Sequence, residues 1–122
     1  MINYYFERQT QNQPYFLKIT FQPEQPILSS YLFQISDKQI YDWIVKGLNK
    51  VLSGKSEYVE RDTEWYGAKI TSQNTIFYVL ADEKDTETNV ITTEDFKIVL
   101  NAWWNEKNFF EKWKDENYRK LV

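Results

Sequence analysis

Carboxylates are the side chains of this sequence best placed to do chemistry, and they are unevenly distributed. Residues 57–95 hold ten acidic and three basic residues, a net charge of −7, whereas the whole chain carries −3, so the remainder carries +4. Such a region could hold calcium, repel nucleic acid or dock onto a basic protein surface. The run from Asp82 to Glu87 lacks the ligand spacing and the glycine of an EF-hand loop, which argues against a specific calcium site. A solvated acidic loop and a docking surface for a basic partner both remain open.

The residue types that are missing narrow the chemistry further. The chain has no cysteine and no histidine, which excludes disulfides, thiolate zinc sites and Cys or His nucleophiles. Its three glycines form no phosphate-binding loop, and its basic residues are scattered. A carboxylate pair for glycoside hydrolysis remains open, although no pair is marked out. We therefore expect a protein with no catalytic residues, no metal, no cofactor and no direct binding of nucleic acid.

Aromatic residues crowd one segment near the C-terminus, NAWWNEKNFFEKW at 101–113. At 100° per residue, Phe109 falls nearly opposite the apolar stripe that begins at Phe96, and Trp104 falls at the edge of that stripe. In one interpretation the helix ends or bends near residues 105–108, so that both adjacent phenylalanines pack. In the other, the surplus aromatics form an exposed contact surface, since interface cores are enriched in aromatic residues.

The elements that must position these residues follow from periodicity and caps. Alternating or short apolar runs predict strands at 2–7, 15–21, 31–35, 57–60, 65–71 and 75–80. The form of a capping box, Ser36-Asp37-Lys38-Gln39, predicts a helix that runs to Leu52, with Gly54 at its C-terminal cap. Thr92-Thr93-Glu94-Asp95 begins the last helix, with hydroxyls at the cap and carboxylates in the first turn.

This order of elements, ββ(β)αβββα, predicts one α+β domain over residues 1–122, with a single, mostly antiparallel sheet and two main helices packed on it. The N-terminal residues show no basic region followed by a long apolar run, so we expect no signal peptide. No apolar stretch approaches the roughly 18–20 residues of a membrane span. We therefore expect a cytoplasmic protein that does not bind a membrane.

Four segments carry a resemblance to a known family: QIYDWIVKGLNKVLSGKSEYVE, WYGAKI, NTIFYVLAD and ITTEDFKIVLNAWWNEKNF. The region from Leu32 to Phe109 resembles small bacterial immunity proteins, which are encoded beside polymorphic or contact-dependent toxins. The resemblance implies a stoichiometric inhibitor without catalytic residues. Its partner would be the C-terminal domain of a cognate toxin, often a nuclease, whose active site or neighbouring surface it would cover.

Together these observations predict a protein that binds its partner through an acidic, aromatic-containing surface and is a monomer or a weak homodimer. The residues predicted to supply charge are Asp82, Glu83, Asp85 and Glu87, with a second rim at Glu60, Asp62 and Glu64. Trp104 and Phe109 are the predicted anchors. The alternatives are a small carbohydrate- or ligand-binding module with aromatic platforms, an enzyme with paired carboxylates, and a homo-oligomer that buries its surplus aromatics.

Overall fold

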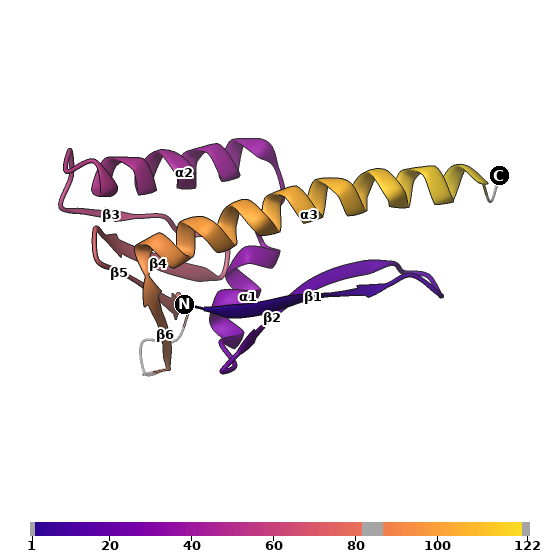
Figure 1. Ribbon diagram of the computed structural model, residues 1–122, viewed down its shortest axis with the longest axis horizontal. Coiled ribbons are helices and arrows are strands. Elements are labelled where there is room, and N and C mark those ends of the chain that lie inside the picture. Colours follow the sequence, from indigo (N-terminus) through magenta and orange to yellow (C-terminus); the bar gives the residue numbers. More distant parts are fainter. Residues whose placement is uncertain (1, 82–86, 121–122) are drawn as a thin grey trace.

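The computed structural model describes residues 2–81 and 87–120, and within them the chain forms two antiparallel sheets and three helices (Figure 1). The two-stranded sheet comprises β1 (Asn3–Gln9) and β2 (Phe16–Gln22). The four-stranded sheet has the order β3-β4-β5-β6, with β3 (Tyr58–Glu60), β4 (Tyr66–Thr71), β5 (Asn74–Val79) and β6 (Thr88–Thr92). The helices are α1 (Pro26–Phe33), α2 (Lys38–Leu52) and α3 (Thr93–Lys120).

The α+β class is confirmed, but the prediction of a single sheet is wrong. The β1–β2 hairpin runs beside the second half of α3, whereas the four-stranded sheet lies near the first half (Figure 1). Apolar side chains from one face of β2, Leu17, Ile19 and Phe21, enter the core, where β2 contacts both α1 and α3. The hairpin is therefore held by the helices and is not paired with the other strands.

The prediction of a strand at residues 31–35 is also wrong, because Tyr31 and Leu32 lie in α1. Pro26 occupies the start of this helix, where a missing backbone N–H costs nothing. The helix has no side-chain cap from its own Gln25. Instead, the Asn89 side chain of β6 accepts hydrogen bonds from the backbone N–H groups of Ile27 and Leu28, at 2.8 and 3.1 Å.

The second helix follows the prediction closely, with a small change at its start. Asp37, and not Ser36, is the N-cap residue, because its carboxylate accepts a 2.9 Å hydrogen bond from the N–H of Ile40. Gly54 follows the C-cap with a φ of 80°, the left-handed conformation that glycine adopts without steric cost.

The four-stranded sheet presents one face to the helices, which all contact it. Residues on this inner face are buried, including Ala68 and Ile70 of β4, Phe77 of β5 and Ile91 of β6. The sequence predicted three of the four strands within one residue at each end. It missed β6, which pairs antiparallel with β5 and places Ile76 opposite Val90.

The last helix is one unbroken element of 28 residues, so the predicted end or bend near residues 105–108 is wrong. Thr92 Oγ1 accepts a 3.2 Å hydrogen bond from the N–H of Asp95, as the capping sequence predicted. The buried Thr93 hydroxyl donates to the carbonyl oxygen of Thr71 at 2.6 Å, which fastens the start of α3 to β4. Within the described chain, no helix combines the length and the apolar character needed to cross a bilayer.

Because α3 continues straight, the two adjacent phenylalanines point in different directions. Phe110 is 3% exposed and belongs to the core, whereas Phe109 is 64% exposed. We expect Phe110→Ala to lower the free energy of unfolding by about 3–5 kcal/mol, because it leaves a cavity in the core. The matched variant Phe109→Ala should change it by less than about 0.5 kcal/mol. Urea denaturation of both variants checks this, and equal losses would contradict the assigned helix phase.

Candidate protein-binding surface

The face of the four-stranded sheet that points away from the helices carries exposed apolar and charged side chains. Cross-strand register places its residues on one side: Glu60 is opposite Lys69, Lys69 is opposite Ile76, and Ile76 is opposite Val90. We call this surface the outer face and define it by Tyr58, Glu60, Lys69, Ile76, Tyr78 and Val90. Five of these side chains are exposed, and that of Tyr78 is half-buried.

The centre of the outer face is apolar. Ile76 and Val90 form a cross-strand pair, and Val90 is 51% exposed. Tyr78 lies across β4 at Gly67, where an added Cβ would overlap the tyrosine ring. Glycine is therefore required at that position for the ring to approach the strand. The Lys69 ammonium lies 5.0 Å from the centre of the Tyr78 ring and supplies the basic charge of this face.

Carboxylates gather at one end of the sheet. The β3–β4 loop and the β5–β6 connection meet there, because the N–H of Leu80 donates a 3.0 Å hydrogen bond to the carbonyl oxygen of Trp65. Thr88 pairs with Tyr78, which brings Glu87 to the same end. Three predicted residues, Asp62, Glu64 and Glu87, lie at this end, and a fourth, Glu60, ends β3 two residues before Asp62. The other predicted carboxylates, Asp82, Glu83 and Asp85, lie outside the described residues.

The charge of these carboxylates affects their neighbours. The Tyr58 hydroxyl donates to Glu60 Oε1, and this hydrogen bond is the main reason why the pKa of Tyr58 rises to about 12. Partial burial raises the pKa of Asp62, and the nearby Glu60 carboxylate adds to the effect. A positive charge placed beside these carboxylates would relieve this repulsion.

The nearest arginine is directed away from the carboxylates. Arg61 Nε donates to the backbone carbonyl of Trp43 at 3.0 Å, and its guanidinium stacks on the Trp43 ring at 4.7 Å. The same side chain fills the space beside Gly47, where a Cβ would clash with it. Arg61 is thus committed to joining the β3–β4 loop to α2.

The predicted aromatic anchors lie elsewhere. Trp104 is half-buried between α2 and α3, where it stacks on Tyr41 with ring centres 4.7 Å apart and planes 8° from parallel. Phe109 lies in the second half of α3, beside the Arg8 guanidinium at 5.9 Å from the ring centre. The structure therefore brings four predicted carboxylates together but places neither predicted anchor with them.

The apolar residues that do accompany the carboxylates were missed by the sequence reasoning. Trp65, in the β3–β4 loop, is 55% exposed, and Leu80 is exposed beside it. Tyr58, Ile76 and Tyr78 are on the outer face. The alternation of side chains along a strand could have identified them. In β3, Tyr58 lies on the opposite face from Val59, and in β5, Ile76 and Tyr78 lie on the opposite face from Phe77.

No relationship to known proteins identifies this surface. Comparison of the chain with models of protein families, with curated proteins and with solved structures finds no match. Across the described residues, no three His, Cys, Asp or Glu side chains stand close enough together to hold a metal ion. What the arrangement offers chemically is an apolar sheet face with a negatively charged end.

The Tyr58–Glu60 contact can be tested by titration. We expect the Tyr58 phenol to lose its proton at a pKa of about 12, above the ordinary value of 10.0, because ionisation would break its hydrogen bond to the Glu60 carboxylate. Glu60→Gln should return the pKa towards 10, while Glu64→Gln should leave it unchanged. NMR titration of the tyrosine ring carbons measures both effects. An unchanged pKa in Glu60→Gln would contradict the assigned contact.

Proposed function

We propose that this chain is a protein-binding protein that acts by stoichiometric association of its outer face with a basic protein surface. The observation that carries the proposal is the uncovered sheet face, which combines exposed apolar side chains at its centre with carboxylates at one end. A sheet with one face towards solvent ordinarily presents polar residues there. Exposed apolar groups beside a charged rim are typical of a surface that becomes buried in a complex.

The two parts of the surface would contribute differently to binding. Burial of Tyr58, Ile76 and Val90 would supply most of the affinity, because apolar area removed from water contributes about 25 cal/mol per Å² before the costs of association. The carboxylates would increase the rate of encounter and would disfavour acidic partners. Association should therefore weaken at high salt, which screens charges over about 10 Å at 0.1 M.

The specific form of this proposal is an immunity protein that neutralises a cognate bacterial toxin domain in the cytoplasm. It rests on the resemblance of residues 32–109 to that family and on the match between an acidic surface and the basic cleft of a nuclease. Carboxylates of the inhibitor would occupy the positions that nucleic-acid phosphates otherwise take. No chemical step by the chain itself is needed for this function.

The proposed function predicts tight binding to the toxin domain encoded beside this gene, and surface plasmon resonance at low and high salt measures its affinity and its association and dissociation rates. We expect Asp62→Lys combined with Glu64→Lys to weaken binding about tenfold at low salt, mainly through slower association. Asp115→Lys combined with Glu116→Lys makes the same change in net charge on exposed positions of α3. This matched control should bind as the unaltered protein does.

The apolar centre is tested in the same assay. Val90→Asp should weaken binding about tenfold or more through faster dissociation, because it would bury a charge in the complex. Ile98→Asp is the matched control, since Ile98 is similarly exposed but lies on α3. Absence of any binding would refute the toxin partner. Binding that resists both the charge reversal and Val90→Asp would refute the outer face as the site.

A further inference from the structure

The outer edge of β6 pairs with no other strand of the described chain. The sheet order β3-β4-β5-β6 leaves one side of β6 paired with β5 and the other side open. An open edge offers a row of backbone N–H and C=O groups to an added strand. Asn89 fixes the position of this edge, because its side chain also caps α1 through the N–H groups of Ile27 and Leu28. An incoming strand would therefore meet a fixed template.

β6 lacks the features that ordinarily prevent the addition of a strand, which include charged side chains, prolines and short length. Of the other edge strands in the described chain, β1 contains Glu7 and Arg8, and β2 contains Lys18. β3 has only 3 residues and ends at Glu60. The sequence of β6, TNVIT, contains no charged residue and no proline, and it is rich in the β-branched residues that strands favour. This edge is therefore the one best suited to pairing.

An open groove of about 340 Å³ runs along the C-terminal half of this edge, where Val90, Ile91 and Thr92 line it. Val90 is exposed on the outer face and Ile91 is buried on the inner face. A groove that touches both residues therefore follows the edge between the two faces. Its other side is formed by the open end of the hairpin, at Ile2 and residues 22–23, which lies beside β6 (Figure 1). The edge thus borders space that an extended chain could enter.

Acidic residues lie at both ends of β6. The carboxylate end of the sheet, with Asp62 and Glu64, is where the strand begins. Glu94 and Asp95 follow the end of the strand, in the first turn of α3, and Asp95 also lines the groove. Neither Glu94 nor Asp95 forms an ion pair with another described residue. An added strand would therefore meet negative charge at each of its ends.

This distribution of charge argues against a second copy of the chain as the added strand. Antiparallel pairing of β6 with its own copy would place Glu94 and Asp95 of one copy at the carboxylate end of the other. Parallel pairing would place the two carboxylate ends side by side. Like charges would oppose association in both directions. A segment with a basic residue at each end would instead be attracted at both ends, whichever its direction.

We propose that β6 accepts an extended segment of a basic partner protein as an added strand of the sheet, with uncharged residues in the middle of the segment and a lysine or arginine at each end. Main-chain hydrogen bonds would supply affinity. The side chain opposite Val90 would extend the apolar pair of Ile76 and Val90 on the outer face. The nature of the partner rests on the proposed function, whereas the position of the added strand rests on β6 itself.

The test uses a blocked seven-residue peptide in which threonine and valine alternate between two terminal lysines. Hydrogen exchange of the whole protein is followed by NMR as the peptide concentration increases. We expect the N–H groups of β6 that do not pair with β5 to exchange at least about tenfold more slowly at saturation. The N–H groups of β3, at the opposite edge of the sheet, should not change. Absence of saturable protection on β6 would overturn the inference.

Methylation of the peptide backbone distinguishes strand pairing from docking through side chains. An extended strand directs alternate N–H groups to opposite edges, and an added strand pairs through only one edge. Methylation of one alternate set of peptide nitrogens should abolish binding, and methylation of the other set should preserve it. Equal effects of the two sets would overturn strand pairing.

Charge variants test the chemistry of the occupant. Asp95→Asn should weaken binding of the lysine peptide about threefold, and glutamates in place of its lysines should weaken binding about tenfold or more. Asp115→Asn, the matched change at an exposed position near the other end of α3, should have no effect. Equal binding of the lysine and glutamate peptides would overturn the basic class. Protection of β6 that increases with protein concentration alone would assign the edge to a second copy and overturn the choice of partner.

Failure of this inference and failure of the proposed function give different results. If the toxin domain binds and the peptide does not, the edge site is refuted and the proposed function stands. If the peptide binds and the toxin domain does not, the toxin partner is refuted and the edge site stands.

Discussion

The arrangement of the sheet, the helices and the carboxylate end depends on one buried side chain, Tyr31 of α1. Its ring contacts Phe77 of β5 and Phe96 of α3 edge to face, with ring centres 5.0 and 6.0 Å apart. Its hydroxyl donates a 2.6 Å hydrogen bond to the carbonyl oxygen of Arg61. Burial raises the pKa of Tyr31 far above its ordinary value, so the hydroxyl remains a donor. This bond fixes the loop that carries Asp62, and the core thereby positions the proposed docking surface.

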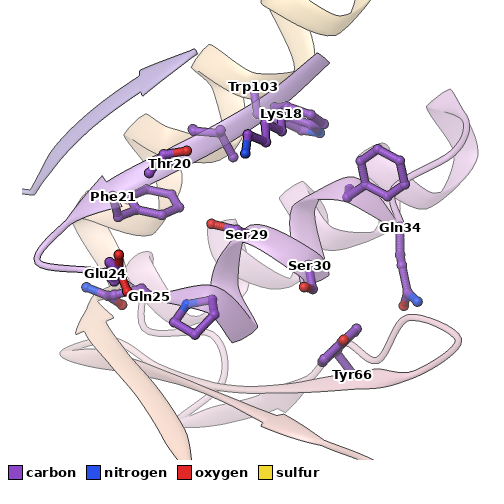
Figure 2. Close-up of a pocket in the computed structure, with 13 residues that line it drawn as sticks. Lys18, Thr20, Phe21, Glu24, Gln25, Ser29, Ser30, Gln34, Tyr66 and Trp103 are labelled. Carbon is purple, nitrogen blue, oxygen red and sulfur yellow. The ribbon is translucent and has the colours of Figure 1, made fainter. Parts of the chain in front are cut away.

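Helix α1 connects the carboxylate end of the sheet to this core. Asn89 caps its N-terminus from β6, two residues after Glu87, and thus ties the helix to the carboxylate end of the sheet. Opposite its buried Tyr31, the same helix presents Ser29 and Phe33 to an open cavity between α1 and β2 (Figure 2). The eight residues of α1 thus lie between the two sheets, contribute side chains to the core and form one wall of a cavity.

The part of the fold that local sequence specifies was predictable, and the part that depends on distant partners was not. α2 was predicted because it has one apolar side, one polar side and a capping sequence directly before it, in which Asp37 proves to be the cap. Residues 31–35 were predicted to form a strand because they are a short apolar run, and α1 itself has no clear polar stripe. It is contacted on several sides, by β2, β4, β5 and β6, and so it has few polar positions to reveal a helical period. Its cap, Asn89, is 62 residues away from Ile27. No local sequence pattern could indicate the contacts that surround α1 or its cap by a residue so far along the chain.

The candidate docking surface shows the same division. The excess of acidic residues in 57–95 was visible in the sequence, but their meeting at one end of a sheet depends on the pairing of β4 with β5. Alternation places Ile76 and Tyr78 on one face of β5 and Phe77 on the other, but both faces carry apolar residues, so the pattern alone does not say which face is buried. Three helices contact the sheet from one side, and they cover the face of Phe77. The apolar residues left on the uncovered face exceed what this fold needs, and that surplus is the physical reason to look for a partner there.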